Sequence, residues 1–371
     1  MKYIIILLLM PLAGFSQLKL SGRVINTNNG KPVANASVFF NNATIGTKSG
    51  EDGTFALRNL RPGQYDLIVS VVGFEKYTQT VMINKSIVMP DIKMQPKVTM
   101  MKVVRIGNDP KRARKLRLFK EYFLGTSDFS RKCEIVNPDV IDLHFSKNEN
   151  VLTGSTEDFL EIDNDALGYK LRYIVNSFVL DKTAAKVGYD GPVFFEEKDG
   201  TAEQKERWKK NRRDIYYGSV THFLREILAN RADTDYLVRN FCFKDFDKLN
   251  IDKKFTWDTL HVADYVHATD RPGVFAITNN GKLDIFYYPY RHMKFKESNL
   301  RTHQGILVAT ISFIDQYLYF DSNGTILNPL GVFFENGWSV TRVADLLPMD
   351  YWPQDGGEAD YLGPKVDYKL Q

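Results

Sequence analysis

The second half of the sequence contains histidines and carboxylates whose spacing could support metal binding. His222 and Glu226 are four residues apart, so an α-helix would bring both side chains to its polar face. A zinc site requires a third protein ligand, and an ordinary side-chain pair is the favoured interpretation. His261, Asp264 and His267 could share a helix face, but the segment also alternates like a strand, which would divide them between two faces. We therefore predict no metal ligands.

Two acidic clusters could supply the paired carboxyl groups of a glycoside hydrolase, and the second could also supply oxygen ligands for calcium. The favoured interpretation places both on solvated turns and strand edges. The run Asp163-Asn164-Asp165 also lacks the glycine and the remaining spacing of an EF-hand loop. The first cluster contains Glu157, Asp158, Glu161, Asp163 and Asp165, and the second contains Glu196 and Glu197.

Local catalytic motifs do not occur in the sequence. It has no HExxH zinc motif, no His-x-x-Glu pair of the carboxypeptidase type, no GxSxG nucleophile elbow and no GxxxxGK[ST] phosphate loop. We therefore predict no catalytic residues and no cofactor-binding residues.

The two cysteines, Cys133 and Cys242, leave two interpretations open. If the chain is exported, they could form a disulfide that closes a loop of about a hundred residues, worth roughly 4 to 5 kcal/mol on the chain-entropy model. The alternative is two separately buried thiols. Spacing alone does not show whether their Cα atoms come within bridging distance.

The N-terminus has the pattern of an export signal. Lys2 gives a positive start, residues 4–12 form an apolar run shorter than a membrane span, and Gly14-Phe15-Ser16 is a small-x-small cleavage site. We predict a signal peptide at residues 1–16 and no transmembrane segment in the mature chain. The protein is then expected in the periplasm, on the outer-membrane surface or in the medium.

Length and charge limit the architecture and the partners. The 371 residues favour two domains, and 13% aromatic residues favour β-rich packing. A net charge of +4 is too small for a typical nucleic-acid-binding protein, so no nucleic-acid partner is expected. The basic cluster at residues 111–117 is interpreted as a solvated linker or a helix start.

Residues 17–95 predict a small β-sandwich because named turns separate short alternating strands. Asn29-Gly30 and Asp52-Gly53 are tight-turn signals, and Pro62-Gly63 fits a type II turn. Tyr65, Leu67, Val69 and Val71 repeat with period two, as on a strand with one buried face.

These turns and strands form a series of short motifs, among them Gly22-x-Val24, Gly30-x-Pro32, Asp52-Gly53-x-Phe55, Leu60-x-Pro62-Gly63-x-Tyr65 and Ser70-x-x-Gly73-Phe74. The segment resembles the carboxypeptidase regulatory-like family, a transthyretin-like sandwich of about seven strands. In the namesake enzymes this module accompanies a separate zinc peptidase domain, so the resemblance implies no peptidase activity.

Residues 96–117 are predicted to be a linker, and residues 118–371 an α+β domain with an antiparallel or mixed sheet. Residues 169–180 are expected to form one strand that pairs near residues 193–195. Thr201-x-x-Gln204 predicts a capping box, and a second helix is expected from Ser219. Hairpins are expected around Asn280-Gly281 and Asn323-Gly324. This domain is similar to the second half of exported bacterial proteins of unestablished activity, and it lacks the strand repeats of a membrane barrel.

Two functions from different classes remain open after these observations. The favoured one is an exported, non-enzymatic cell-envelope protein that acts as a scaffold or interaction module for an envelope protein or a glycan. Tyr216, Tyr217 and Trp338 would be its candidate contact residues if exposed, although burial is the expected fate of each. The alternative is a glycan or peptide hydrolase whose active site is assembled in the C-terminal domain. The sequence does not predict the oligomeric state.

Overall fold

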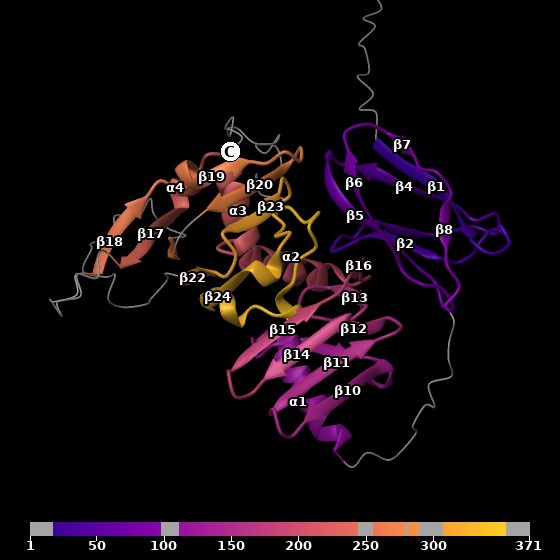
Figure 1. The fold of residues 1–371 in the computed structure, drawn as a ribbon, viewed down its shortest axis with the longest axis horizontal. Helices are drawn as coiled ribbons and strands as arrows, with labels where there is room; N and C mark the ends of the chain where they lie inside the picture. Colours follow the sequence, from indigo (N-terminus) through magenta and orange to yellow (C-terminus); the bar gives the residue numbers. More distant parts are fainter. Residues whose placement is uncertain (1–17, 98–110, 244–254, 279–280, 289–306, 354–371) are drawn as a thin grey trace, which may run out of the picture.

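The chain forms three lobes, each with its own hydrophobic core. The computed structural model describes residues 18–97, 111–243, 255–278, 281–288 and 307–353. Figure 1 shows the N-terminal sandwich (residues 18–97) beside the middle lobe (residues 111–200) and the C-terminal lobe (residues 201–337). We call residues 338–353 the C-terminal strap. The predicted signal peptide lies outside the described residues.

The N-terminal sandwich has two sheets, as the turn pattern predicts. One sheet has the order β4-β1-β7, with β8 also paired to β1, and the other has the order β3-β2-β5-β6. Tyr65, Leu67 and Val69 are buried, and the Tyr65 ring stacks on Phe40 at 4.4 Å between centroids. The strands are β1 (Leu18–Asn26), β2 (Ser37–Phe40), β3 (Gly46–Lys48), β4 (Thr54–Leu60), β5 (Gly63–Ser70), β6 (Tyr77–Ile83), β7 (Ile87–Val88) and β8 (Ile92–Met94).

One edge of the sandwich is interrupted. Both β7 and β8 run parallel to β1, at successive positions along it. Pro90 lies between them and has no N–H to donate to the ladder. The seven strands of the expected sandwich therefore become eight, because this edge strand is divided in two.

The middle lobe pairs two antiparallel sheets with one helix. The sheet orders are β10-β11-β14-β15 and β16-β13-β12-β9. Helix α1 (Arg112–Leu124) buries Phe119 and Phe123 in the same core. The strands are β9 (Cys133–Ile135), β10 (Ile141–Ser146), β11 (Val151–Thr156), β12 (Leu160–Asn164), β13 (Tyr169–Tyr173), β14 (Ser177–Asp181), β15 (Lys186–Asp190) and β16 (Val193–Glu197).

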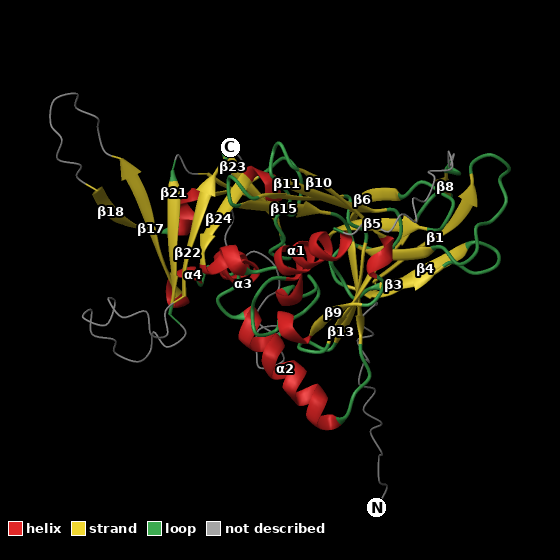
Figure 2. Ribbon diagram, turned by 90° about the horizontal axis from the view of Figure 1, so that it is seen from below, coloured by secondary structure: helices red, strands yellow, loops and turns green. Residues whose placement is uncertain are grey.

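The C-terminal lobe combines helices with two antiparallel sheets. The five-stranded sheet has the order β18-β17-β21-β22-β24 and the three-stranded sheet has the order β19-β20-β23. Figure 2 shows α2 projecting from the body of the molecule. The helices are α2 (Ala202–Tyr216), α3 (Val220–Leu228) and α4 (Ala232–Asp235). The strands are β17 (Tyr236–Phe243), β18 (Phe255–Leu260), β19 (Val266–Ala268), β20 (Val274–Thr278), β21 (Lys282–Tyr287), β22 (Leu307–Phe313), β23 (Tyr317–Asp321) and β24 (Val332–Asn336).

Several local predictions for the second half are confirmed. Thr201 and Gln204 form the predicted capping box at the start of α2, and Ser219 caps α3. Strand β16 pairs with β13. The turn at Asn323-Gly324 brings Ile326 back to an antiparallel bridge with Phe320. The basic cluster at residues 111–117 is the start of α1, so this helix begins inside the predicted linker.

Two strand predictions are wrong. Residues 169–180 divide into β13 and β14, which belong to different sheets. Strands β20 and β21, on either side of Asn280-Gly281, also belong to different sheets and do not pair as a hairpin. In both cases the chain crosses from one sheet to the other, and local sequence does not specify which partner strand it meets.

Contacts between the sandwich and the middle lobe are apolar and close. Phe39 and Ile68 of the sandwich pack against Phe159 and Ile174 of the middle lobe, and all four are buried. Beside them, the Phe195 N–H donates to the carbonyl of Ala43 over 3.0 Å. This contact gives the two lobes a fixed relative position.

The C-terminal strap passes through all three cores in turn. Trp338 belongs to the core of the C-terminal lobe, Val343 and Ala344 to that of the middle lobe, and Met349 to that of the sandwich. Among the described residues, no helix is long and apolar enough to span a membrane.

Candidate functional site

His222 and Glu226 lie inside the molecule, which corrects the prediction that they occupy a polar helix face. The side chains of both are buried because every residue of α3 from His222 to Leu228 faces protein. His222 Nε2 is 3.9 Å from Glu226 Oε1, too far for a hydrogen bond. Glu226 instead accepts two hydrogen bonds from Arg231, at 2.9 and 3.0 Å. His222 and Glu226 therefore do not bond to each other, and each bonds to other protein groups.

The surroundings of His222 keep its ring neutral. Nδ1 accepts a hydrogen bond from the Gly218 N–H at 3.2 Å and lies 2.7 Å from the Tyr236 hydroxyl. Burial, together with the charges of Arg225 and Arg231, lowers the pKa of His222 to about 3. A group with this pKa is not protonated at neutral pH, so it is a poor candidate for a general acid.

The second histidine group is also dispersed. His261 pairs with Asp233 over 2.5 Å at an exposed position, and His267 lies on β19. In the part of the chain that the structure describes, no three His, Cys, Asp or Glu side chains converge as metal ligands.

The acidic clusters are joined to basic side chains. Asp163 and Asp165 both pair with Lys198, and Asp165 also bonds Arg207 of α2. Arg212, also on α2, bonds Glu197 at 2.7 Å, and the remaining pairs are Glu196 with Arg172 and Glu157 with Lys97. These ion pairs hold α2 and the strand ends together, as expected for solvated edges.

The two cysteines occupy different lobes. Cys133 lies on β9, and burial raises the pKa of its thiol to about 12. Cys242 lies on β17, with its side chain outside the described residues. The disulfide between them therefore stays a prediction. Of the three aromatic contact candidates, Tyr216 and Trp338 are buried, while Tyr217 is exposed.

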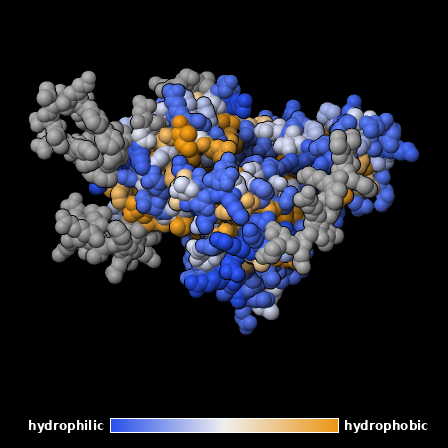
Figure 3. All heavy atoms as spheres, turned by 60° about the horizontal axis from the view of Figure 1, so that its bottom comes forward, coloured by the Kyte–Doolittle hydropathy of each residue, from blue (hydrophilic) through white to orange (hydrophobic). Residues whose placement is uncertain are grey.

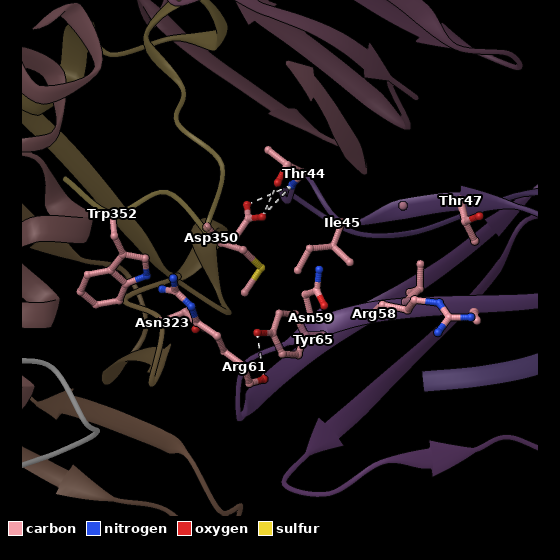
Figure 4. A pocket seen from close by; sticks show the side chains of 14 residues that line it. Thr44, Ile45, Thr47, Arg58, Asn59, Arg61, Tyr65, Asn323, Asp350 and Trp352 are labelled. Carbon is pink, nitrogen blue, oxygen red and sulfur yellow. Dashed lines mark hydrogen bonds between the residues drawn. The ribbon is translucent and has the colours of Figure 1, made fainter. Parts of the chain in front are cut away.

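A groove of about 470 Å³ lies where the sandwich meets the C-terminal strap. One wall comes from edge strand β3 and the loop before it, the floor from β4 and β5, and the other wall from the strap together with Asn323. Figure 4 shows Trp352 at one end of the groove, and Thr47 and Arg58 at the other. The volume falls in the range of ordinary ligand sites.

A buried arginine fixes the strap wall. Arg225 on α3 is 1% exposed, and its guanidinium donates to the carbonyls of Asn323, Met349 and Tyr351 at 2.7 to 2.9 Å. The same group lies 3.8 Å from the centre of the Trp352 ring. These contacts settle the position of Trp352 before any ligand arrives.

The carboxylate in the groove is already hydrogen-bonded. Asp350 accepts from the Thr44 N–H at 3.0 and 3.2 Å, and from the Thr44 hydroxyl at 2.5 Å (Figure 4). Arg58 and Arg61 line the same groove, so its net charge is positive. Below them, burial raises the pKa of Tyr65 to about 12, which keeps its phenol neutral.

Sequence reasoning missed this groove. Its residues come from positions 44–65, 323 and 349–352, which no local motif connects. The neighbouring aromatic residues Tyr351 and Trp352 were the available signal for a binding site, because an aromatic group beside arginines is a common element of binding surfaces.

The sequence from residue 20 to 106 matches the family model described as the CarboxypepD_reg-like domain. The N-terminal sandwich is a CarboxypepD_reg-like domain. The predicted sandwich, at residues 17–95, lies within nearly the same bounds. A comparison of the whole chain with curated proteins returned no match.

The solved structures that match this chain share little sequence identity with it. A type II cohesin–X-dockerin complex from Acetivibrio cellulolyticus shares 13% identity over 21% of this chain and 58% of that one, with a TM-score of 0.20. The pilus 2b backbone protein of group B streptococcus shares 15% over 22% and 41%, with a TM-score of 0.19. A DUF3823 family protein from Bacteroides ovatus shares 12% over 49% and 100%, with a TM-score of 0.18. The chain thus covers 58% of the matched cohesin–X-dockerin chain and 41% of the pilus protein.

Surface character differs between the CarboxypepD_reg-like domain and the C-terminal lobe. In Figure 3 the sandwich side is mostly hydrophilic, whereas hydrophobic surface gathers toward the C-terminal lobe. Ile314 and Leu330 there are 67% and 75% exposed. Ile314 and Leu330 do not line the groove, whose charged lining residues are Arg58, Arg61 and Asp350.

Proposed function

We propose that the protein is an exported, non-enzymatic interaction module of the cell envelope, which holds a protein or glycan partner in the groove between the CarboxypepD_reg-like domain and the C-terminal strap. The observation that supports this proposal is the preformed groove wall: Arg225 holds Trp352 in place through backbone carbonyls of the strap. A site prepared in this way loses little conformational entropy on binding.

The groove is better suited to binding than to hydrolysis. Glycoside hydrolysis uses two carboxyl groups about 5 to 10 Å apart. Among the described residues that line the groove, Asp350 is the single carboxylate, and Thr44 occupies both of its oxygens. The neutral, buried His222 lies outside the groove lining. The hydrolase alternative gains no support from this arrangement.

Site-specific photo-cross-linking in intact envelopes tests the proposal. A photoreactive amino acid replaces Asn59, which is exposed in the groove, or Lys85, which is exposed on the turn after β6. We expect a discrete cross-linked product from position 59 that position 85 does not give, and that Arg58→Glu diminishes. Equal products from both positions, or none from position 59, would contradict the proposal.

A further inference from the structure

The groove is bounded by sheet edges, and this determines what kind of partner fits it. Strand β4 is the outermost strand of its sheet and β3 is the outermost strand of the other. Both contribute residues to the groove lining. An outermost strand presents backbone N–H and C=O groups on its open side, which can pair with a further strand.

The hydrogen-bond alternation identifies the open groups on β4. Val24 donates to the Gly53 carbonyl over 2.8 Å, and in the β1–β4 register Phe55 lies opposite Gly22. Since bonded and non-bonded pairs alternate in an antiparallel ladder, Phe55 and Leu57 direct their backbone groups toward β1. Ala56 therefore directs its N–H and C=O away from β1. The regular alternation ends after Leu57, where the register shifts and Asn59 has a φ of 57°. Within the described residues, no hydrogen bond reaches the outward groups of Ala56, whereas the outward C=O of Thr54 accepts from the Gly50 N–H over 2.9 Å.

The side chains around this open edge are apolar on one face and charged on the other. Leu57, Tyr65 and Met349 are buried below it, whereas Arg58 is exposed above it. A strand added beside β4 would point alternate side chains toward the apolar floor and toward the arginine.

We propose that the partner is an acidic polypeptide segment in extended conformation, which adds to β4 as a new edge strand in the groove. This inference rests on the proposed function and specifies its partner class. Backbone pairing with Ala56 would supply binding strength, and acidic side chains facing the Arg58 guanidinium would supply selectivity. A glycan offers neither the repeating N–H and C=O groups nor their strand spacing.

Synthetic probes test the proposal on the full-length mature protein. The first probe is a fluorescent eight-residue peptide of alternating glutamate and valine. A second peptide has the same sequence with alternate backbone nitrogens methylated, a third replaces glutamate by lysine, and an acidic oligogalacturonate represents the glycan class. Fluorescence anisotropy gives the affinity of each peptide, and competition gives that of the oligosaccharide.

We expect the acidic peptide to bind saturably, and both altered peptides to bind at least about tenfold more weakly. Arg58→Glu should weaken the acidic peptide by a similar factor, while the matched charge change Lys85→Glu should have no effect. Hydrogen exchange of the amides on β4 should slow when the acidic peptide is bound, because its backbone covers their open side.

Two results would overturn the inference. Equal binding of the methylated and unmethylated peptides would show that no strand is added, and this comparison uses the wild-type protein, so it does not depend on a variant folding. Binding of the oligogalacturonate alone would leave the interaction module intact but with a glycan partner. If neither probe binds and position 59 gives no cross-linked product, the proposed function fails as well.

Discussion

Arg225 is unusual at the scale of single residues because it is a buried cation bonded mainly to uncharged groups. Its guanidinium donates to three backbone carbonyls, with the Tyr216 hydroxyl 3.4 Å away. A planar fork with five N–H donors can satisfy such a set, whereas a lysine ammonium cannot match its geometry. Arg225 therefore determines the path of the strap and, through it, the shape of the groove.

Replacing Arg225 should separate its structural role from simple charge. We expect Arg225→Lys to lower the free energy of unfolding by about 2 to 4 kcal/mol, since buried carbonyls lose their donors. The exposed change Lys209→Arg on α2 should leave stability within about 0.5 kcal/mol of wild type. Urea denaturation followed by tryptophan fluorescence measures both, and an unaffected Arg225→Lys variant would show that the carbonyls find other donors.

His222 should make the protein sensitive to acid. Its pKa is lowered to about 3 in the folded chain against 6.5 for a free histidine, so the folded state binds fewer protons below pH 6.5. This group's contribution to stability is full above pH 6.5, and about 3 kcal/mol of it should be lost by pH 4. Buried Asp321 opposes this trend, because burial raises its pKa to about 6 and favours the folded state as pH falls.

A comparison of variants separates the contribution of His222 to the pH dependence of stability from that of Asp321. His222→Asn keeps an acceptor near Nδ1 but does not titrate, so its unfolding free energy should fall less than that of the wild type between pH 7 and pH 4. The exposed His144→Asn should follow the wild type. Parallel pH profiles for His222→Asn and wild type would refute the assignment.

At the scale of elements, α2 is attached to the middle lobe through a buried tryptophan in addition to its ion pairs. Trp208 is 2% exposed and donates through its indole N–H to the Asp165 carbonyl. Gly168 has a φ of 69°, and a Cβ there would lie 2.2 Å from the Trp208 ring. Backbone conformation and contact with the ring therefore both require glycine at this position.

The change Gly168→Ala should loosen α2 specifically. We expect a loss of about 2 to 4 kcal/mol from the combined strain and overpacking. Gly188→Ala is the control, because no atom lies within 4 Å of its Cβ position. Hydrogen exchange of residues 202–216 should accelerate in Gly168→Ala, and unchanged exchange there would contradict the role given to Trp208.

The sequence predicted those elements best whose conformation depends on neighbouring residues in the chain. The CarboxypepD_reg-like domain follows from turns such as Asp52-Gly53, whose glycine has a φ of 78° and would place a Cβ 2.4 Å from the Val24 carbonyl oxygen. The helix starts at Thr201 and Ser219 are likewise local. The predicted hairpin of β20 with β21 was wrong, because Asn280-Gly281 indicates only that the chain turns and not which strands pair. The groove was not predictable, because Arg58 and Trp352 are separated by most of the chain.

At the scale of the whole molecule, the strap joins lobes that each have a separate core. It places Trp338, Ala344 and Met349 in three different cores within twelve residues. Burying apolar surface in all three lobes couples their stabilities, since none of these contacts survives if the strap detaches. The groove is thus a property of the complete assembly, because its strap wall depends on this attachment.

Truncation tests this coupling. A chain that ends at Thr341 should lose the strap side of the groove and unfold in more than one calorimetric transition, because the sandwich then keeps only its contacts with the middle lobe and with Asn323. The full-length protein keeps the strap and should unfold in one transition. A single transition in the shorter chain would show that the packing of Phe39 on Phe159 suffices for coupling.

The division of the edge strand at Pro90 makes the two borders of its sheet unequal as sites for strand pairing. An added segment at β4 would meet a single strand with one register shift near its end, whereas the opposite border of the same sheet offers only two short pieces on either side of a proline. A sheet open on both borders can pass pairing from molecule to molecule and grow into a fibre. Because only the β4 border of this sheet can pair with a further strand, each copy of this protein would bind one segment, and strand pairing would not continue to another copy.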